Sequence, residues 1–293
     1  MNILLTGGTG LIGSALVEAG LKQGHTFTIL SRQNKSDTDG IHYVKNLDEP
    51  GTDLEFDAVI NLAGEPVADA RWSPARKKIL LDSRIETTQK LINFVAMLEH
   101  TPPLLINASA VGWYGNQNSS PLTEESEAEN EFAHELCQLW ENAAFAAERI
   151  GMRVCILRIG LVLASNGGFL KRMLTPFKFG LGGRLGSGKQ YMSWIHIDDI
   201  VAMIYFLIQN ASCQGIFNGT APTPVSNSVF TNALATALHR PAIFPVPASI
   251  LKLIFGELSK VLLGGQYVVP AKFEKAGYQF KYPALKEAIK SVV

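Results

Sequence analysis

The chain has 293 residues, of which 47% are hydrophobic and 18% charged, and this composition excludes a disordered or fibrous protein. Its 26 Lys and Arg balance its 26 Asp and Glu, so it lacks the positive excess with which proteins hold nucleic acids or anionic membranes. Three scattered cysteines argue against a disulfide framework or a zinc site, and the lack of a leading signal or an 18-residue apolar run predicts a cytoplasmic protein.

Over the first 167 residues, short apolar runs alternate with helical patterns. A run of four to six apolar or β-branched residues predicts a buried strand. The predicted strands are Asn2–Thr6, His25–Leu30, Ala58–Leu62, Leu104–Asn107 and Val154–Leu157. The predicted helices follow Gly13 and cover Ser83–Leu98 and Glu131–Ile150. This alternation is typical of βαβ units and predicts an α/β fold with a Rossmann-type doubly wound parallel sheet.

The pattern changes after about residue 165. A glycine-rich stretch at 180–190 predicts a binding loop, residues 198–210 predict a helix, and five prolines in 221–247 resemble a boundary. We therefore predict an NAD(P)-binding domain over residues 1–167, to which residues 195–210 return. A smaller α/β substrate region covers 168–194 and 211–293, in which residues 246–293 form a small C-terminal helical domain.

The first turn carries a glycine pattern that predicts dinucleotide binding. Glycines at 7, 10 and 13 fit GxxGxxG, and those at 8, 10 and 13 fit GxGxxG. Glycine accepts positive φ and lets the backbone approach a diphosphate at the start of a helix. The alternative, a purely structural glycine turn, lacks this strand-turn-helix setting. The predicted contacts are Gly7, Thr9, Gly10, Leu11, Ile12 and Gly13.

The end of the second predicted strand indicates which dinucleotide is bound. An NAD site usually has Asp or Glu here, to accept a hydrogen bond from the ribose 2′-OH. This strand ends with Ser31 and Arg32, and the next acid is Asp37. A guanidinium suits a 2′-phosphate, and a serine hydroxyl adds a donor, so these residues favour NADP(H). The alternative is that Arg32 is a solvated residue at the end of the strand.

Several motifs resemble the extended short-chain dehydrogenase/reductase superfamily. They are GGTGLIG, NLAGE at Asn61–Glu65, SRIETT at Ser83–Thr88, SAVGWYG at Ser109–Gly115 and WIHIDD at Trp194–Asp199. Within it, Pro176–Asp199 and Leu262–Leu285 resemble the nucleoside-diphosphate-sugar epimerase-like family that has a C-terminal domain of unknown function.

The resemblance implies further contacts. Leu62, Ala63 and Gly64 would line the cofactor, Arg84 would reach it from the following helix, and Val162 would contact its nicotinamide end. Trp194 and His196 would lie where such enzymes close over a substrate. Asp198 and Asp199, beside His196, are better explained as the start of a helix than as metal ligands, so we expect no metal.

The catalytic positions depart from the superfamily, which uses Ser, Tyr and Lys to exchange a proton with the substrate oxygen. Ser109 matches the serine, but Cys137 and Glu141 stand where the resemblance expects Tyr and Lys. These two side chains are i, i+4 neighbours and would share one side of the helix, near His134.

Two interpretations of this departure stay open. A thiol, with an ordinary pKa of about 8.5 against about 10 for a phenol, can exchange a proton, although a nearby carboxylate raises its pKa. Alternatively, Cys137 fills space and Glu141 is solvated. Tyr114, five residues after Ser109, is either a replacement acid or a packing aromatic.

The sequence thus predicts an NADP(H)-dependent oxidoreductase or epimerase that acts on a small carbonyl or hydroxyl compound, such as a nucleotide sugar. Basic residues between 166 and 194 suit a phosphorylated substrate, although scattered surface charge explains them equally well. The rival hypothesis is an NADP(H)-binding regulator or scaffold that has lost the chemistry. The sequence leaves a homodimer open.

Overall fold

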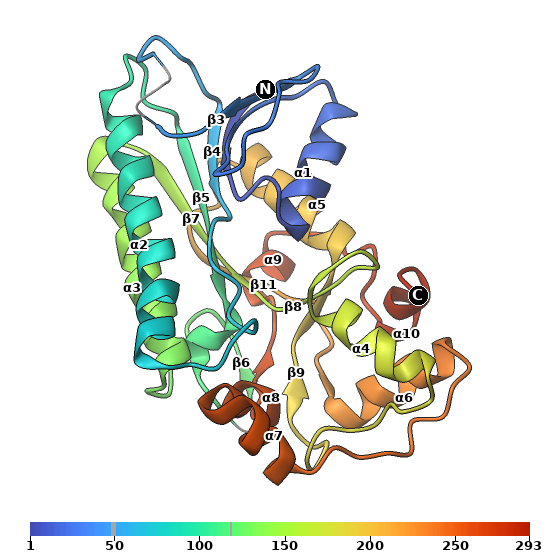
Figure 1. The fold of residues 1–293 in the computed structure, drawn as a ribbon. Helices are drawn as coiled ribbons and strands as arrows, with labels where there is room; N and C mark the ends of the chain where they lie inside the picture. The colour runs from blue at the N-terminus through green and yellow to red at the C-terminus, as the bar shows by residue number, and fades with distance from the viewer. Residues whose placement is uncertain (48–50, 118) are drawn as a thin grey trace.

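The computed structural model describes residues 1–47, 51–117 and 119–293, and a seven-stranded parallel sheet forms its centre (Figure 1). The strand order is β11-β7-β5-β4-β1-β2-β3, which confirms the doubly wound Rossmann-type sheet. The strands are β1 (Asn2–Thr6), β2 (Thr26–Leu30), β3 (Ile41–Val44), β4 (Ala58–Asn61), β5 (Leu104–Ala110), β7 (Arg153–Ile159) and β11 (Gly215–Gly219).

Helices cover both faces of this sheet. Figure 1 shows α2 (Pro74–Met97) and α3 (Phe132–Phe145) on one face, and α1 (Leu11–Leu21) and α5 (Ile197–Gln209) on the other. Successive side chains of β1 enter two different cores: Ile3 and Leu5 pack with the α1 and α5 side, whereas Leu4 packs with the α2 and α3 side. Burial on both faces explains why these strands are continuous apolar runs.

A second lobe lies below the carboxyl edge of the sheet (Figure 1). Its helices are α4 (Gly168–Lys178), α6 (Asn227–Ala237), α7 (Ala248–Phe255), α8 (Ser259–Leu263) and α10 (Leu285–Lys290), whereas α9 (Ala271–Lys275) packs against β11 of the main sheet. Three small sheets pair β8 (Leu161–Leu163) with β10 (Trp194–His196), β9 (Tyr191–Met192) with β12 (Val225–Ser226), and β6 (Pro121–Leu122) with β13 (Tyr267–Val268). Short 3-10 turns are η1 (Val111–Tyr114), η2 (Ala146–Ile150) and η3 (Gly256–Leu258).

Some elements differ from the sequence prediction. Helix α2 begins at Pro74, with the Ser73 side chain as its cap, rather than at Ser83. Strand β3 and helix α4 were not predicted, and α6 occupies the proline-rich stretch that resembled a boundary. Strand β11 completes the main sheet, although residues 211–293 were assigned to the substrate region.

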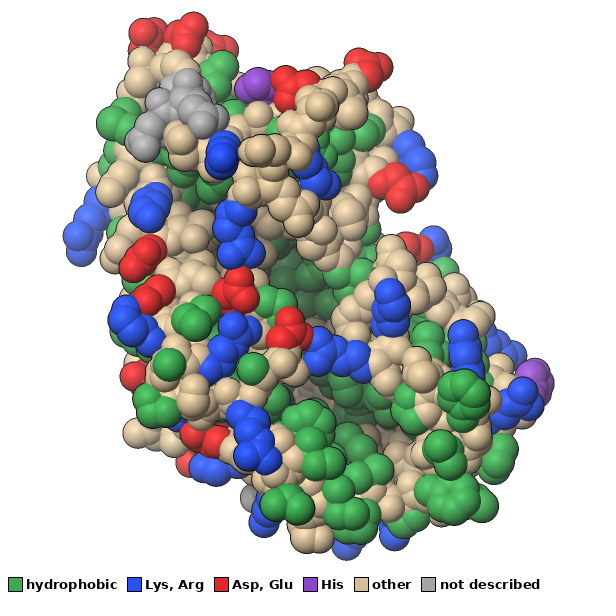
Figure 2. Space-filling model, in the orientation of Figure 1, with side chains coloured by type: hydrophobic (Ala, Val, Ile, Leu, Met, Phe, Trp, Pro, Cys, Tyr) green, Lys and Arg blue, Asp and Glu red, His purple; other side chains and the backbone are tan. Residues whose placement is uncertain are grey.

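The lobes are joined by polar contacts around a hollow, whose floor is hydrophobic and whose rim is charged (Figure 2). The Arg172 guanidinium of α4 donates to the Ala68 carbonyl at 2.9 Å and pairs with Asp69. The Arg71 side chain donates to the carbonyl of Ile254, at the end of α7. Among the described residues, none of the helices combines the length and the apolar character that a membrane span requires.

Candidate cofactor and reaction site

The glycine turn between β1 and α1 packs tightly against neighbouring backbone. Gly7 has φ +70°, and a Cβ on it would lie 2.6 Å from the carbonyl carbon of Leu62. A Cβ on Gly13 would lie 2.2 Å from the Gly7 carbonyl oxygen. Any other residue at either position would collide with backbone, so these glycines are needed for the tight approach of strand, turn and helix.

The amino end of α1 is open to a ligand. Its N-cap is Gly10, and no side chain among the described residues caps it. Thr9 and Gly10 are exposed. The uncapped N–H groups and the positive end of the helix dipole are suited to bind an anion. Gly168 lies between the Leu11 side chain and the Val162 carbonyl, so the structure brings these two predicted contacts to the same place.

Ser31 and Arg32 lie at the end of β2 and differ in their surroundings. The Arg32 side chain is 90% exposed, and its Nη1 lies 3.0 Å from the Glu65 carboxylate. Ser31 is buried, and its hydroxyl is paired with the backbone of Gln33 at 3.2 Å. Arg32 therefore presents charge outward, whereas Ser31 shapes the turn.

Residues 62–64 and Arg84 also meet. The Ala63 N–H donates to Thr6 Oγ1 at 3.3 Å, which ties this loop to β1. The Arg84 guanidinium lies against Gly64 and 5.1 Å from the centre of the Trp140 ring. Burial lowers the pKa of Arg84. This side chain closes the loop from the α2 side.

A buried chain of polar side chains supports the edge of the sheet beneath this loop. The Asn61 amide donates to Asn107 at 2.6 Å and to Thr88 at 2.8 Å, and its oxygen accepts from Thr6 at 2.5 Å. Thr6 and Asn61 end β1 and β4, Asn107 lies in the middle of β5, and Thr88 lies on α2. Asn61 belongs to the NLAGE motif, but the sequence alone indicates no role for it.

Ser109 and Glu141 are brought together by a residue that sequence reasoning missed. The Ser109 hydroxyl donates to Glu141 Oε1 at 2.6 Å. Arg158, which pairs with Ser109 in register between β5 and β7, donates to both carboxylate oxygens at 2.9 and 2.8 Å. Of the two interpretations left open, the one in which Glu141 is solvated is wrong, because Glu141 is only 3% exposed.

Aromatic residues of η1 cover this network. The Arg158 guanidinium lies 3.5 Å from the centre of the Trp113 ring. Tyr114 is fully buried, and its hydroxyl donates to Asn218 of β11 at 2.7 Å. Burial raises the pKa of Tyr114. In this arrangement Tyr114 packs as an aromatic, one of its two predicted roles.

Cys137 is a neutral neighbour of the network. Its Sγ lies 3.7 Å from the Ala110 carbonyl, and the residue is 4% exposed. Burial, reinforced by the charge of Glu141, raises the pKa of this thiol to about 11. His134 does not join them, because its Nδ1 lies 2.6 Å from the Trp113 carbonyl. The helix thus supplies a protonated thiol and an ion-paired carboxylate.

Trp194 and His196 are buried and bound to protein groups. The Trp194 indole donates to the Thr223 carbonyl at 3.0 Å. His196 Nδ1 accepts from the Asp198 N–H and so caps α5, while its Nε2 lies 3.0 Å from Ser291 Oγ. Burial lowers the pKa of His196. Asp198 lies in the first turn of α5 as predicted, but the cap is His196.

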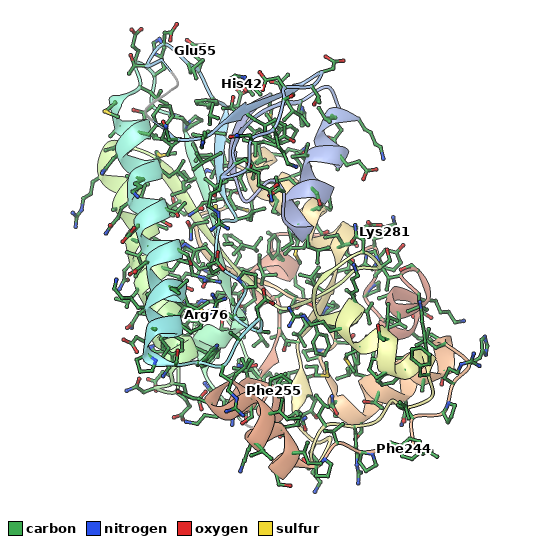
Figure 3. The ribbon with its side chains drawn as sticks, in the orientation of Figure 1. His42, Glu55, Arg76, Phe244, Phe255 and Lys281 are labelled. Atoms are coloured by element: carbon green, nitrogen blue, oxygen red, sulfur yellow. The ribbon has the colours of Figure 1, made fainter. Side chains whose placement is uncertain are left out.

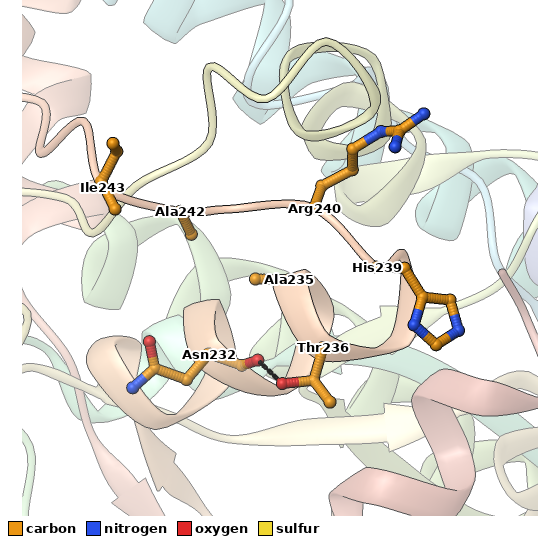
Figure 4. A pocket seen from close by; sticks show the side chains of 7 residues that line it. All are labelled: Asn232, Ala235, Thr236, His239, Arg240, Ala242 and Ile243. Carbon is orange, nitrogen blue, oxygen red and sulfur yellow. Dashed lines mark hydrogen bonds between the residues drawn. The ribbon is translucent and has the colours of Figure 1, made fainter.

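A separate cavity of about 490 Å³ lies between α6 and the following segment (Figure 4). None of the predicted site residues lines it, and it is separate from the cofactor and reaction site at the carboxyl edge of the sheet. Its lining residues are Asn232, Ala235, Thr236, His239, Arg240, Ala242 and Ile243.

Comparisons with known proteins agree with this geometry. Residues 3–218 match the NAD dependent epimerase/dehydratase family, and residues 246–292 match a domain of unknown function (DUF1731). An epimerase family protein of Staphylococcus aureus strain MW2 is 39% identical over 295 residues, covering 99% of this chain and 98% of its own.

Two solved structures are also similar. Human epimerase family protein SDR39U1, crystallised with NADPH, has a TM-score of 0.91 and 33% identity and covers 100% of this chain and 99% of its own. A nucleoside-diphosphate sugar epimerase from Corynebacterium glutamicum has a TM-score of 0.80 and 32% identity, over 99% of this chain and 57% of that longer one. Together with the glycine turn and the match over most of its length, these relatives show that the chain belongs to the NAD dependent epimerase/dehydratase family.

Proposed function

We propose that the protein is an NADP(H)-dependent oxidoreductase or epimerase acting on a hydroxyl or carbonyl group of a small molecule, with nucleotide sugars as the first class to test. The observation that carries this proposal is the uncapped start of α1 behind the glycine turn, with Arg32 beside it. The NADPH in the human relative and the name of the Corynebacterium relative support the cofactor and the substrate class.

Different residues of the chain would bind different parts of the cofactor. The turn from Gly7 to Gly13 would hold the diphosphate, and Arg32 would hold the 2′-phosphate. Residues 62–64 with Arg84 would line its adenosine side, and Val162 its nicotinamide end. When bound, the dinucleotide supplies hydride transfer.

The buried network would handle the proton. Because the Ser109 hydroxyl donates to Glu141, its free lone pair accepts a hydrogen bond and suits a substrate hydroxyl rather than a carbonyl. During oxidation of that hydroxyl, its proton would pass to Ser109 as the Ser109 proton passes to Glu141, while hydride leaves the carbon. The protonated Cys137 thiol is the second group able to exchange a proton there.

The test is a binding titration followed by a substrate screen. We expect pure protein to quench or shift NADPH fluorescence at lower concentrations than NADH, and to turn over one member of a panel of nucleotide sugars and small alcohols. Ser109→Ala should lower kcat with little change in cofactor affinity, because the Ser109 hydroxyl would contact the substrate oxygen and not the cofactor.

A second function is favoured by one observation. Glu141 already has two partners, Ser109 and Arg158, inside the protein, so its carboxylate oxygens are paired without any substrate. A regulator or scaffold that binds NADP(H) without turnover would retain this arrangement for stability alone. Tight NADPH binding with no turnover of any compound, and no effect of Ser109→Ala, would support this function over the first.

We further propose that residues 1–167 with 195–210 bind the cofactor and that 168–194 and 211–293 hold the substrate, apart from β11, which lies in the main sheet. A cytoplasmic location and a homodimer stay predictions. Sedimentation of the pure chain tests the second.

A further inference from the structure

Two loops meet across the turn that would hold the cofactor. Arg32 follows β2 and Glu65 follows β4, and in the sheet these strands are the two neighbours of β1. The 3.0 Å contact between Arg32 Nη1 and Glu65 Oε1 therefore spans the carboxyl end of β1, where the glycine turn begins. The ion pair therefore lies beside the turn at which a dinucleotide would bind.

The two partners are held very differently. Glu65 donates its N–H to Ser83 Oγ, and its carbonyl accepts from Arg84 at 3.0 Å. Its second carboxylate oxygen lies 3.5 Å from Arg76, whose side chain also donates to the Pro66 carbonyl. Arg76 lies near the start of α2, toward the middle of the molecule (Figure 3). Glu65 is thus held by several contacts, whereas the exposed Arg32 side chain has room to change its rotamer.

The charges around Glu65 are unequal. Two guanidinium groups, those of Arg32 and Arg76, contact the Glu65 carboxylate, and that of Arg84 contacts the backbone carbonyl of the same residue. Together these four groups carry a charge of 3 − 1 = +2. A phosphate monoester at neutral pH carries close to two negative charges. If Arg32 moves to such a phosphate, Arg76 keeps Glu65 paired, and no charge is left without a partner.

We propose that the Arg32–Glu65 ion pair is a selectivity gate at the adenosine end of the cofactor site. Opening the pair opposes the binding of either dinucleotide. Only NADP(H) replaces the lost contact, because its 2′-phosphate takes the Arg32 guanidinium, whereas the 2′-OH of NAD(H) offers no comparable charge. The inference rests on the proposed function, and it adds Glu65 and Arg76 to the residues that choose the cofactor.

The gate makes a prediction that a simple phosphate-binding arginine does not. Arg32→Met should weaken NADPH binding about ten-fold or more, through loss of a charge-assisted hydrogen bond. The same variant should tighten NADH binding about two- to five-fold, the range for an exposed ion pair. Glu65→Gln should tighten both dinucleotides by that smaller factor, and adding Arg32→Met to it should leave NADH binding unchanged.

The experiment is a fluorescence titration of the full chain and these variants with NADPH and NADH, at low and at high salt. Rising salt screens the diphosphate of either dinucleotide and also weakens the gate, so NADH binding should lose less affinity with salt in the wild type than in Arg32→Met. Glu65→Gln, which keeps Arg32, tests the gate independently if Arg32→Met fails to fold. Unchanged NADH affinity in both variants, together with the same salt dependence of NADH binding as in the wild type, overturns the gate. Failure of the wild type to bind either dinucleotide overturns the proposed function instead.

Discussion

The guanidinium of Arg158 and the carboxylate of Glu141 form a two-point ion pair inside the protein, where their side chains are 1% and 4% exposed. Glu141 stands at the position where the resemblance expects a lysine. A lysine there would meet the like charge of Arg158, and a buried like-charge pair is strongly unfavourable. The departure from the superfamily pattern on α3 is therefore matched by the charge that β7 supplies.

Breaking this ion pair from one side should be costly. Arg158→Met leaves the Glu141 carboxylate buried without its main partner, and we expect a loss of about 3–5 kcal/mol of unfolding free energy. Replacing both residues, as in Glu141→Leu with Arg158→Met, should lose less than the single variant, since no unpaired charge remains. Urea unfolding of the two proteins checks this, and equal losses would contradict it.

Two glycines with similar positive φ values make it possible to distinguish an effect on cofactor binding from an effect on stability. Gly7 has φ +70° and Gly24 has φ +75°, but a Cβ on Gly7 would collide with the Leu62 carbonyl, whereas one on Gly24 meets nothing within 4 Å. Both alanine variants pay about 1–2 kcal/mol for the left-handed backbone. Only Gly7→Ala should abolish NADPH binding in a fluorescence titration. Retained binding in Gly7→Ala would remove the diphosphate from this turn.

The buried thiols should make the protein less stable at alkaline pH. Burial raises the pKa of Cys137, and also that of Cys155, to about 11. Because the unfolded chain releases these protons near its ordinary thiol pKa of about 8.5, the unfolding free energy falls from about that pH up to about 11. Urea unfolding from pH 7 to 10.5 measures the decline, which should be shallower in Cys137→Ala.

The same thiols should be inert in the folded state. All three cysteines, Cys137, Cys155 and Cys213, are free and buried. At pH 8 we expect Ellman's reagent to label them only after unfolding, because the thiolate is the reactive form. Rapid labelling of native Cys137 would show that the thiol has access to solvent and a lower pKa.

Neighbouring acids at the start of α5 provide a matched test of the C-terminal attachment. The fully buried Asp199 carboxylate accepts from the backbone N–H groups of Lys281 and Tyr282 and from the Tyr278 hydroxyl. Asp199→Asn should lower the unfolding free energy by about 1.5–3 kcal/mol and make the C-terminal segment sensitive to protease. Asp198 is 45% exposed and pairs with Lys281 Nζ, so Asp198→Asn should lower the unfolding free energy by less than about 1 kcal/mol.

The sheet and its first turn were predictable because their signals are local. Strands such as β1 are buried on both faces and appear as unbroken apolar runs, and the glycines of the turn follow directly. Helix α6 was missed because prolines lie on either side of it, at positions 224 and 241. The signal was present: Ser226 caps the helix, and the stretch 227–237 contains no proline.

Arg158 was not predictable in the same way. It follows the apolar run Val154–Leu157, and a charge at the end of a strand is usually solvated. Its burial depends on the pairing of β7 with β5, which places it opposite Ser109. It also depends on Glu141 of α3, whose carboxylate accepts its hydrogen bonds. Such a partnership is a property of tertiary structure, so the sequence pattern of one strand does not contain it.

The pairing of β13 with β6 has a consequence for truncation of this protein. The C-terminal stretch contributes a strand beside Leu122, and Ser193 fastens it by accepting from the Val268 N–H and donating to the Gln266 carbonyl. A gene that lost this stretch would encode a chain with exposed apolar surface and an unpaired strand edge. In this chain, the two segments that match separate family models are therefore parts of one folded unit, and removal of the C-terminal segment should destabilise the rest.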